Sequence, residues 1–298
     1  MLRKSTRSSA ISASTRGDGM KHVYKQVAHS KHALIAAILI IAVWELAVRT
    51  LGIREFLLPM PSRIVETFLS QPGYLLRESL DTLVTTLGGF AAAVILGVAA
   101  AIGIVSSKLL ERTLYALIVA MNAVPKVALA PLFVIWMGTG SAPKITIAML
   151  IAIFPILIDT VLGLKSIDPE MLNMARANQA PRGQVLWKIR FPNALPSIFA
   201  GMKVGVSFAL VGTIVGEFVA GEAGLGHVIL VAQGSFDTPT VFVALVLLGV
   251  LGVLLFKTLE LAEASMIPWH ASHRHAATEK ALSMNADEAR FSVANAKQ

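Results

Sequence analysis

The sequence predicts an all-α integral membrane protein with about six transmembrane helices. Hydrophobic residues make up 55% of the chain and charged residues only 15%, well below the roughly 25% charged residues of a soluble globular domain. The apolar residues gather in six runs, and each run reaches the length of about 20 residues that a helix needs to cross a bilayer. These runs cover about residues 33–52, 83–105, 113–137, 144–164, 194–220 and 241–265.

The distribution of positive charge predicts how the spans are oriented. With the amino terminus placed in the cytoplasm, 18 Lys and Arg residues fall in cytoplasmic segments and 4 fall on the opposite side. Membrane proteins keep such an excess in their cytoplasmic loops, so both termini are expected to be cytoplasmic. The net charge of +8 therefore reflects membrane topology, and it does not predict a nucleic-acid-binding surface.

The segments on either side of the first span also carry patterns that predict their structure. Residues 1–32 are rich in Ser, Lys and Arg, and we expect a disordered cytoplasmic arm. The first apolar run is longer than a typical signal-peptide core and no small-residue cleavage pattern closes it, so it is expected to stay as an anchor. After it, Pro59 and Pro61 interrupt any helix, and a short amphipathic surface helix is expected on the periplasmic side.

Glycines mark the second and fifth spans. Small residues let membrane helices approach closely, because lipid gives helices no hydrophobic reason to associate. On the fifth span the glycines fall on one helix face, which indicates helix packing, or alternatively a dimer seam or the lining of a pathway. The glycines of this stripe are Gly201, Gly205, Gly212 and Gly216.

The third span contains two prolines and a lysine. Proline frees a backbone carbonyl that lipid cannot satisfy, so this helix is expected to break beside protein or water. An intramembrane lysine is costly and usually marks a pathway. Pro125, Lys126 and Pro131 are therefore pathway candidates, together with Glu217, which is the candidate partner if Lys126 is instead paired. Four ionisable residues lie nearer to helix ends, where each could pair or reach the interface: Asp159, Lys203, Glu217 and Lys257.

Nothing in the sequence predicts catalysis, a metal or a cofactor. The chain has no cysteine, which excludes disulfides and thiolate metal sites. It also lacks the GxxxxGK[ST] pattern of a phosphate-binding loop, and its spans hold no grouping of His, acid and nucleophile. Three histidines, His270, His273 and His275, lie in residues 266–298, where we expect a disordered cytoplasmic tail and no metal site.

Residues 165–193 form the longest internal cytoplasmic loop and carry five Lys and Arg residues. Pro169 is expected to start a helix that runs to about Gln179, and Pro181 to start a shorter helix that ends before Pro192.

On the shorter helix, Val185, Leu186 and Ile189 share one face, and Arg182 lies among the basic residues around it. A short helix with an apolar knob and a cationic rim is suited to enter the groove of a partner. The alternative is a basic loop that only enforces topology.

This loop resembles the EAA loop of permease subunits in binding-protein-dependent ABC importers. The pattern of that loop is Glu-Ala-Ala, three residues, Gly, nine residues, Ile, one residue, Leu-Pro. Its Glu falls on Asn173, its alanines on Met174 and Ala175, its Gly on Gln179, its Ile on Ile189 and its last pair on Phe191 and Pro192; only Ala175, Ile189 and Pro192 match outright. Four further stretches are similar to the nitrate, sulfonate and taurine branch of this family: "VPKVALAPLFVIWMG", "GEFVAGEAGLGHVI", "FDTPTVFVALVLLGVLG" and "PWH".

The resemblance implies a type I ABC importer permease fold, with one six-span domain at residues 33–265, in a bacterial inner membrane. It implies three partners besides lipid: a cytoplasmic ATP-binding subunit, a periplasmic substrate-binding protein and a second copy of the permease. The residues expected to couple the chain to the ATPase are Asn173, Ala175, Gln179, Arg182, Val185, Leu186, Ile189 and Pro192.

The resemblance also bears on the substrate. It implies a small anion such as nitrate, a sulfonate or taurine, and the alternative is a pyrimidine precursor of thiamine. An ion-coupled secondary transporter is a further alternative, but that class is built on an internal inverted repeat, which this sequence lacks.

Overall fold

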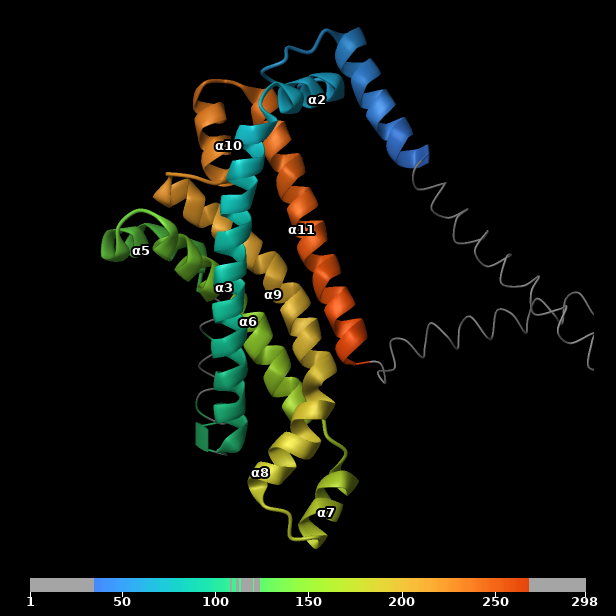
Figure 1. Cartoon of the computed structure of the whole chain (residues 1–298), viewed down its shortest axis with the longest axis vertical. Coiled ribbons are helices and arrows are strands. Elements are labelled where there is room, and N and C mark those ends of the chain that lie inside the picture. The colour runs from blue at the N-terminus through green and yellow to red at the C-terminus, as the bar shows by residue number, and fades with distance from the viewer. Residues whose placement is uncertain (1–34, 108, 111–112, 114–119, 121–123, 268–298) are drawn as a thin grey trace, which may run out of the picture. The chain divides into compact units, whose positions relative to one another are not determined.

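The computed structural model describes residues 35–107, 109–110, 113, 120 and 124–267, and all regular elements within these ranges are helices (Figure 1). The predicted arm, the three tail histidines and nearly all of the predicted tail lie outside the described residues. The chain divides into two compact units. One unit consists of Met1–Ser70 with Phe236–Val243, and the other of Gln71–Ser235 with Ala244–Gln298.

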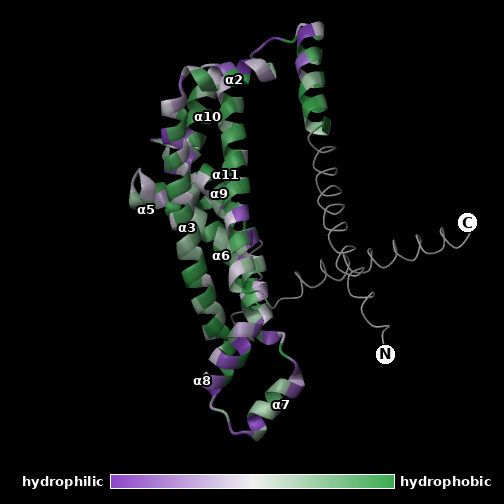
Figure 2. Ribbon diagram, turned by 45° about the vertical axis from the view of Figure 1, so that its right-hand side comes forward, coloured by the Kyte–Doolittle hydropathy of each residue, from purple (hydrophilic) through white to green (hydrophobic). Residues whose placement is uncertain are grey.

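Within the described residues, four helices are long and apolar enough to cross a membrane. They correspond to the second, fourth, fifth and sixth predicted spans, and Figure 2 shows hydrophobic residues along most of their length. The second span starts well before its predicted boundary, because polar residues at its amino end interrupt the apolar run without ending the helix. The four are α3 (Pro72–Ser106), α6 (Ser141–Lys165), the helix Arg182–Ala220 that includes α9 (Phe191–Ala220), and α11 (Thr238–Met266).

The first and third predicted spans are described only in part. Residues 35–51 are helical. The third span is not one continuous helix, because a bend at Val124 and Pro125 precedes the 3₁₀ helix η1 (Lys126–Leu129) and the helix α5 (Ala130–Met137). Pro125 lies just before η1, and Pro131 lies in the first turn of α5, where a missing N–H costs no helical hydrogen bond. The predicted break is therefore confirmed.

The first unit contains the predicted surface helix, α2 (Pro61–Ser70). The carboxylate of Glu45, on the helix at residues 35–51, accepts hydrogen bonds from the backbone N–H of Ser62 (3.0 Å) and from its hydroxyl (2.8 Å). These bonds satisfy one of the free N–H groups at the amino end of α2, where a negative charge is favourable. Trp44 of the same helix lies 5.8 Å from Phe242, measured between ring centroids.

In the second unit, α6 packs between α3 and α9, and the glycines provide the close approach. A Cβ atom on Gly89 of α3 would lie 2.4 Å from the Cβ of Ala148, and one on Gly212 of α9 would lie 2.7 Å from the Cα of the same residue. The other glycines of the α9 stripe also face α6. The stripe is therefore used for packing within the chain, and it is not a dimer seam.

The remaining helices of the second unit lie around this three-helix core. The carboxyl part of α11 lies along α9 (Figure 1) and contributes Leu255 to an apolar cluster with Ile156 and Val206. Helix α10 (Leu225–Gly234) follows α9 after a short loop. Helix α5 packs against α6 and α9. Two regions outside this core are candidates for a functional site: the segment between α6 and α9, and the end of α9 beside α10.

Candidate functional site

The loop between α6 and α9 projects beyond the ends of these two helices (Figure 1). It contains α7 (Pro169–Ala177), α8 (Arg182–Val185) and the π-helical turn Leu186–Arg190. The carboxylate of Asp168 caps α7 by accepting a hydrogen bond of 2.9 Å from the backbone N–H of Glu170. The first predicted helix of the loop is therefore present, and Figure 2 shows that this region is more hydrophilic than the spanning helices.

The second predicted helix does not end before Pro192. It begins after Pro181, as expected, but it runs through the π-helical turn directly into α9. A proline inside a helix removes one N–H donor and crowds the carbonyl four residues earlier. The wider π turn just before Pro192 relieves that conflict, so the chain continues as one helix.

Within this helix, Leu186 does not form the exposed knob that the sequence suggested. Its side chain packs against the apolar cluster of the bundle that includes Leu164 and Ala194. Val185 and Ile189 are half-buried, and Arg182 is exposed. Periodicity predicted a shared face, and the structure places Leu186 of that face against the chain's own core. Leu186 is therefore a contact within the permease.

Three other large apolar side chains of the loop are exposed. Met171 and Met174 lie one turn apart on α7, and the indole of Trp187 lies on the π turn. Their exposed fractions are 50%, 70% and 58%. In contrast, Ala175 is buried, and Asn173 is exposed and accepts a hydrogen bond from Arg176. The projecting loop thus presents a methionine pair and a tryptophan, side chains that are enriched at protein interfaces.

Gln179 explains why the EAA pattern has glycine at this position. Helix α7 ends in a Schellman motif, in which the N–H of Ala180 donates to the carbonyl of Ala175 (3.0 Å) and the N–H of Gln179 to that of Arg176 (2.9 Å). This motif requires a left-handed residue at its centre, and Gln179 has a φ of 52°. Residues other than glycine pay a steric cost there.

Replacing Gln179 by glycine is expected to stabilise the end of α7 by about 1 kcal/mol, because glycine adopts the left-handed conformation without strain. The measurement is the thermal unfolding of the purified chain in detergent, where the variant should melt at a higher temperature. Gly183, which has an ordinary φ and no neighbour within 4 Å of an added Cβ, provides the control. Gly183→Ala should not lower the melting temperature, and an equal or lower melting temperature for Gln179→Gly would contradict the strain at this turn.

The broken third span places Lys126 against α6. Its Nζ lies 4.2 Å from the centroid of the Phe154 ring, within the range of a cation–π interaction. The Glu217 carboxylate does not take Lys126 as its partner, because other groups of the described chain occupy it. Lys126 and Glu217 therefore do not pair with each other in this structure: Lys126 lies over the Phe154 ring, and Glu217 has other partners.

Glu217 lies near the carboxyl end of α9 and its side chain is fully buried. Its carboxylate accepts hydrogen bonds from the Thr82 hydroxyl of α3 (2.8 Å) and from the backbone N–H of Gly226 at the start of α10 (2.7 Å). The Thr82 hydroxyl in turn accepts from the backbone N–H of Leu225 (2.8 Å). The carboxylate therefore joins α3, α9 and the amino end of α10.

Lys144 supplies the positive charge near this carboxylate. The side chain is only 2% exposed, and its ammonium donates to the carbonyl of Ala223 (2.7 Å) and to the carboxylate of Asp81 (3.2 Å). The sequence placed Lys144 at the start of the fourth span on the side opposite the cytoplasm, and the structure shows it at the amino end of α6 in contact with α3 and the loop before α10. Neither Thr82 nor Asp81 had a sequence signal that separated it from other polar residues.

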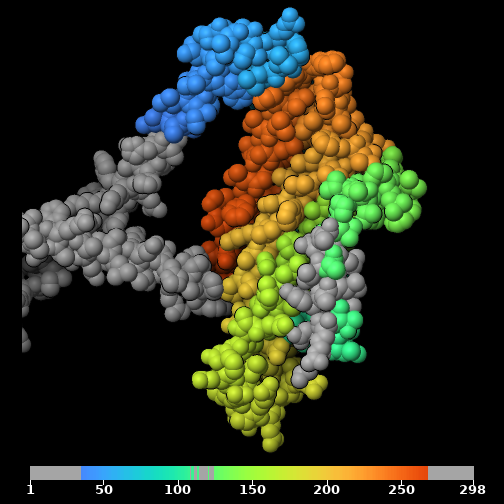
Figure 3. Space-filling model, turned by 180° about the vertical axis from the view of Figure 1, so that it is seen from behind, coloured from blue at the N-terminus to red at the C-terminus, as the bar shows by residue number. Residues whose placement is uncertain are grey.

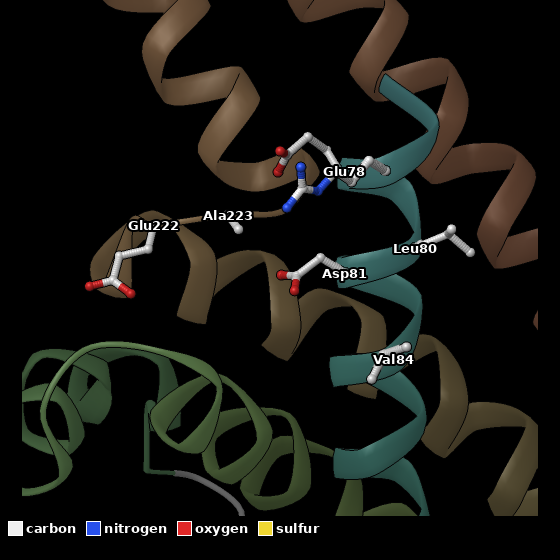
Figure 4. Close-up of a pocket in the computed structure, with 7 residues that line it drawn as sticks. Glu78, Leu80, Asp81, Val84, Glu222 and Ala223 are labelled. Atoms are coloured by element: carbon white, nitrogen blue, oxygen red, sulfur yellow. The ribbon is translucent and has the colours of Figure 1, made fainter. Parts of the chain in front are cut away.

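A pocket of about 560 Å³ opens beside this network (Figure 4). Glu78 and Asp81 project from α3 toward the segment that carries Glu222 and Ala223. The backbone N–H of Gly224 donates to the carboxylate of Glu78 (2.6 Å), so the loop between α9 and α10 is held on this side as well. The pocket therefore lies between α3 and the loop that these hydrogen bonds hold in place.

The other ionisable residues of the spanning helices differ in how they are satisfied. Lys203 of α9 pairs with Glu263 of α11, and Lys257 of α11 pairs with Glu260. These two lysines thus meet the expectation of local pairing. Among the described residues, no group hydrogen-bonds to or pairs with the carboxylate of Asp159, which is half-buried on α6.

Comparison with known families places much of the chain in a transport family. The profile of the family described as "binding-protein-dependent transport system inner membrane component" matches residues 93–265. The matched region includes the broken third span, the projecting loop and the α9–α10 end.

Three relatives show the range of annotated substrates. The chain is 38% identical to the riboflavin transport system permease protein RibX of Chloroflexus aurantiacus, over 80% of this chain and 90% of RibX. It is 30% identical to the formylaminopyrimidine transport permease protein ThiX of Halalkalibacterium halodurans, over 78% and 93% of the two chains. It is 28% identical to the taurine transport system permease protein TauC of Escherichia coli, over 78% and 87%.

A solved structure supports the fold. The chain resembles a chain of the MetNI methionine ABC transporter in an inward-facing conformation, with a TM-score of 0.53 and 22% identity. The similarity covers 65% of this chain and 96% of the other. At this level of identity the likeness concerns the fold alone, and it agrees with the predicted type I permease fold.

Proposed function

The chain belongs to the family of binding-protein-dependent transport system inner membrane components, as a permease subunit of an ABC importer, and on this premise we propose that it forms the pathway for a small organic solute. The ATPase is a separate subunit, and the chain itself is not an enzyme. We propose further that a periplasmic binding protein delivers the solute and that two copies of the chain assemble around the pathway. Both termini would then be cytoplasmic, as the charge distribution predicts.

The observation that carries the proposal is the projecting loop between α6 and α9. It lies beyond the bundle and exposes Met171, Met174 and Trp187 while its own backbone is fixed by a cap and a Schellman motif. A rigid helix with exposed apolar side chains suits insertion into a groove of a partner protein. We propose that α7 enters the ATPase subunit and transmits its closure to α6 and α9, between which the loop is inserted.

The substrate follows less directly from these observations. The relatives compared above are named for riboflavin, a formylaminopyrimidine and taurine, and none of these three for nitrate. We therefore propose a small water-soluble organic solute and no longer include nitrate. The broken segment at Pro125, Lys126 and Pro131 is proposed to lie beside the pathway, where water would satisfy the freed carbonyls.

The proposal is tested by uptake in cells that produce the permease together with its ATPase subunit and its binding protein. Four labelled solutes serve as probes: riboflavin, formylaminopyrimidine, taurine and ethanesulfonate. We expect uptake of at least one of them, and we expect this uptake to vanish when the ATPase subunit carries a substitution in its phosphate-binding loop. Uptake that survives this substitution but is abolished by an uncoupler would instead support an ion-coupled secondary transporter.

The purified chain without its ATPase subunit is expected to bind no ATP, because its sequence has no phosphate-binding loop. Equilibrium binding of labelled ATP to the detergent-solubilised chain is the measurement, with the ATPase subunit as the positive control. Saturable binding at micromolar ATP by the chain alone would show that a nucleotide site exists outside the known motif.

A further inference from the structure

Asp159 is an ionisable residue for which the described part of the chain provides no polar partner. It lies toward the carboxyl end of α6, one of the membrane-spanning helices, and its side chain is half-buried. Within the described part of the chain its carboxylate has no hydrogen-bond or ion-pair partner. Glu217, Lys203 and Lys257, the comparable residues of α9 and α11, all have such partners.

The neighbours of Asp159 on α6 and α9 are a proline and a glycine. On α9, the residue that faces it is Gly201, where an added Cβ would lie 2.9 Å from the Cβ of Asp159. One turn earlier on the same face of α6 is Pro155, which has no N–H to donate to the carbonyl of Ile151. A carboxylate without a partner among the described residues and a carbonyl without its usual helical donor therefore follow one another along this face.

The open side of this face belongs to α6 and α9 together. Figure 3 shows both helices at the surface of the second unit on one side. Leu162 of α6 and Val204 of α9 are among the exposed apolar side chains of these two helices. Hydrocarbon is a costly environment for a charged carboxylate and for a carbonyl without its helical donor. Water, or a polar group from outside the described residues, would satisfy both.

We propose that Asp159 faces the aqueous translocation pathway and selects solutes that carry a cationic or N–H donor group. The carbonyl freed by Pro155 is a second group on the same face that water can satisfy, which favours a continuous aqueous path over a single contact with another chain. A carboxylate accepts hydrogen bonds and attracts positive charge, and it repels an anion that has no donor. This inference rests on the proposed function and restricts the substrate to zwitterions and donor-bearing heterocycles.

The position of Asp159 is tested by chemical labelling that needs no knowledge of the substrate. The chain has no cysteine, so Asp159→Cys introduces a single thiol. In membranes that contain the complete importer, a positively charged methanethiosulfonate reagent should modify this thiol, because the reagent reacts only where water gives access. The matched control is Val253→Cys, at an exposed apolar position of α11, which should face lipid and stay unmodified. An unreactive thiol at position 159 would overturn the proposal.

Selectivity is tested with two variants of opposite character. Asp159→Asn removes the charge, and it should lower uptake of a donor-bearing solute about tenfold, the usual effect of losing a charged hydrogen bond. Asp159→Glu keeps the charge and should retain most of the uptake. Co-purification of the ATPase subunit shows that assembly is intact in both variants. Unchanged uptake by Asp159→Asn would overturn the selective role.

The matched probes taurine and ethanesulfonate differ by one ammonium group and test the same point in the unsubstituted importer. Preference for taurine supports the inference, and equal or better uptake of ethanesulfonate contradicts it. If the unsubstituted importer takes up none of the four solutes, the proposed substrate range fails. In that case the labelling of position 159 still decides whether Asp159 faces the pathway.

Discussion

Replacing Glu217 by alanine is expected to lower the free energy of unfolding by about 3 kcal/mol or more, one of the two largest effects that the structure predicts. The substitution removes the acceptor of the Thr82 hydroxyl and of the Gly226 N–H, and both donors are buried. Each buried donor without a partner costs about 1 to 3 kcal/mol. The buried ammonium of Lys144 also loses a nearby negative charge. Thermal unfolding of the purified chain in detergent measures the effect.

Two further variants show whether the loss comes from this network. Glu217→Gln can accept only one of the two hydrogen bonds, so its melting temperature should lie between those of the alanine variant and the unsubstituted chain. Glu222→Ala removes an exposed carboxylate of the neighbouring loop and should change the melting temperature little. If Glu217→Ala melted like the unsubstituted chain but abolished uptake, Glu217 would belong to the pathway after all.

The hydrogen bonds of Glu217 also predict how a substitution of Lys126 affects stability. Because Thr82 and Gly226 satisfy Glu217, Lys126→Met should not leave the carboxylate without a partner. The stability losses of Lys126→Met and Glu217→Gln should therefore add in the double variant, as they do for independent sites. Rescue of Lys126→Met by Glu217→Gln would mean that the two residues interact in a conformation other than this one.

The sequence alone predicted the elements whose signal is local. Long apolar runs marked the spanning helices, Pro169 marked the start of α7, and the prolines beside Lys126 marked a break. The start of α3 was predicted too late, because hydropathy detects the membrane-embedded part of a helix and not the polar turns that extend it. Each of these predictions rests on residues that are close to one another in the sequence.

The sequence could not predict which helix faces pack against each other in the folded chain. The glycine stripe of α9 was recognised, but its partner α6 was not, because small residues allow close approach to any helix. Leu186 was predicted as part of an apolar knob for a partner, and only the packed structure shows that its side chain lies against the chain's own core. Lys144 was predicted at the start of the fourth span, but its burial against α3 and the loop before α10 had no signal in the sequence.

Replacing Met174 by aspartate is expected to release the ATPase subunit, and this is the second large effect. Met174 is the most exposed large apolar side chain of α7, and neither of the two apolar clusters found among the described residues includes it. Truncating an anchor residue at an interface costs about 2 kcal/mol or more, which corresponds to a loss of affinity of about 30-fold, and a buried charge adds to that loss. Affinity purification of the importer, with quantification of the retained ATPase subunit, is the measurement.

Met174→Leu is the matched control, because it keeps an apolar side chain of similar volume and should retain the ATPase. Leu186→Ala provides the contrast. Since Leu186 packs within the bundle, its truncation should lower the melting temperature of the permease and not the affinity of the folded chain for the ATPase. If Met174→Asp kept the ATPase bound and transported normally, while Leu186→Ala released the ATPase from a chain of unchanged stability, docking would involve the helix before α9. Because α7 and α8 lie on opposite sides of the Gln179 turn, the two variants identify which arm of the loop carries the coupling.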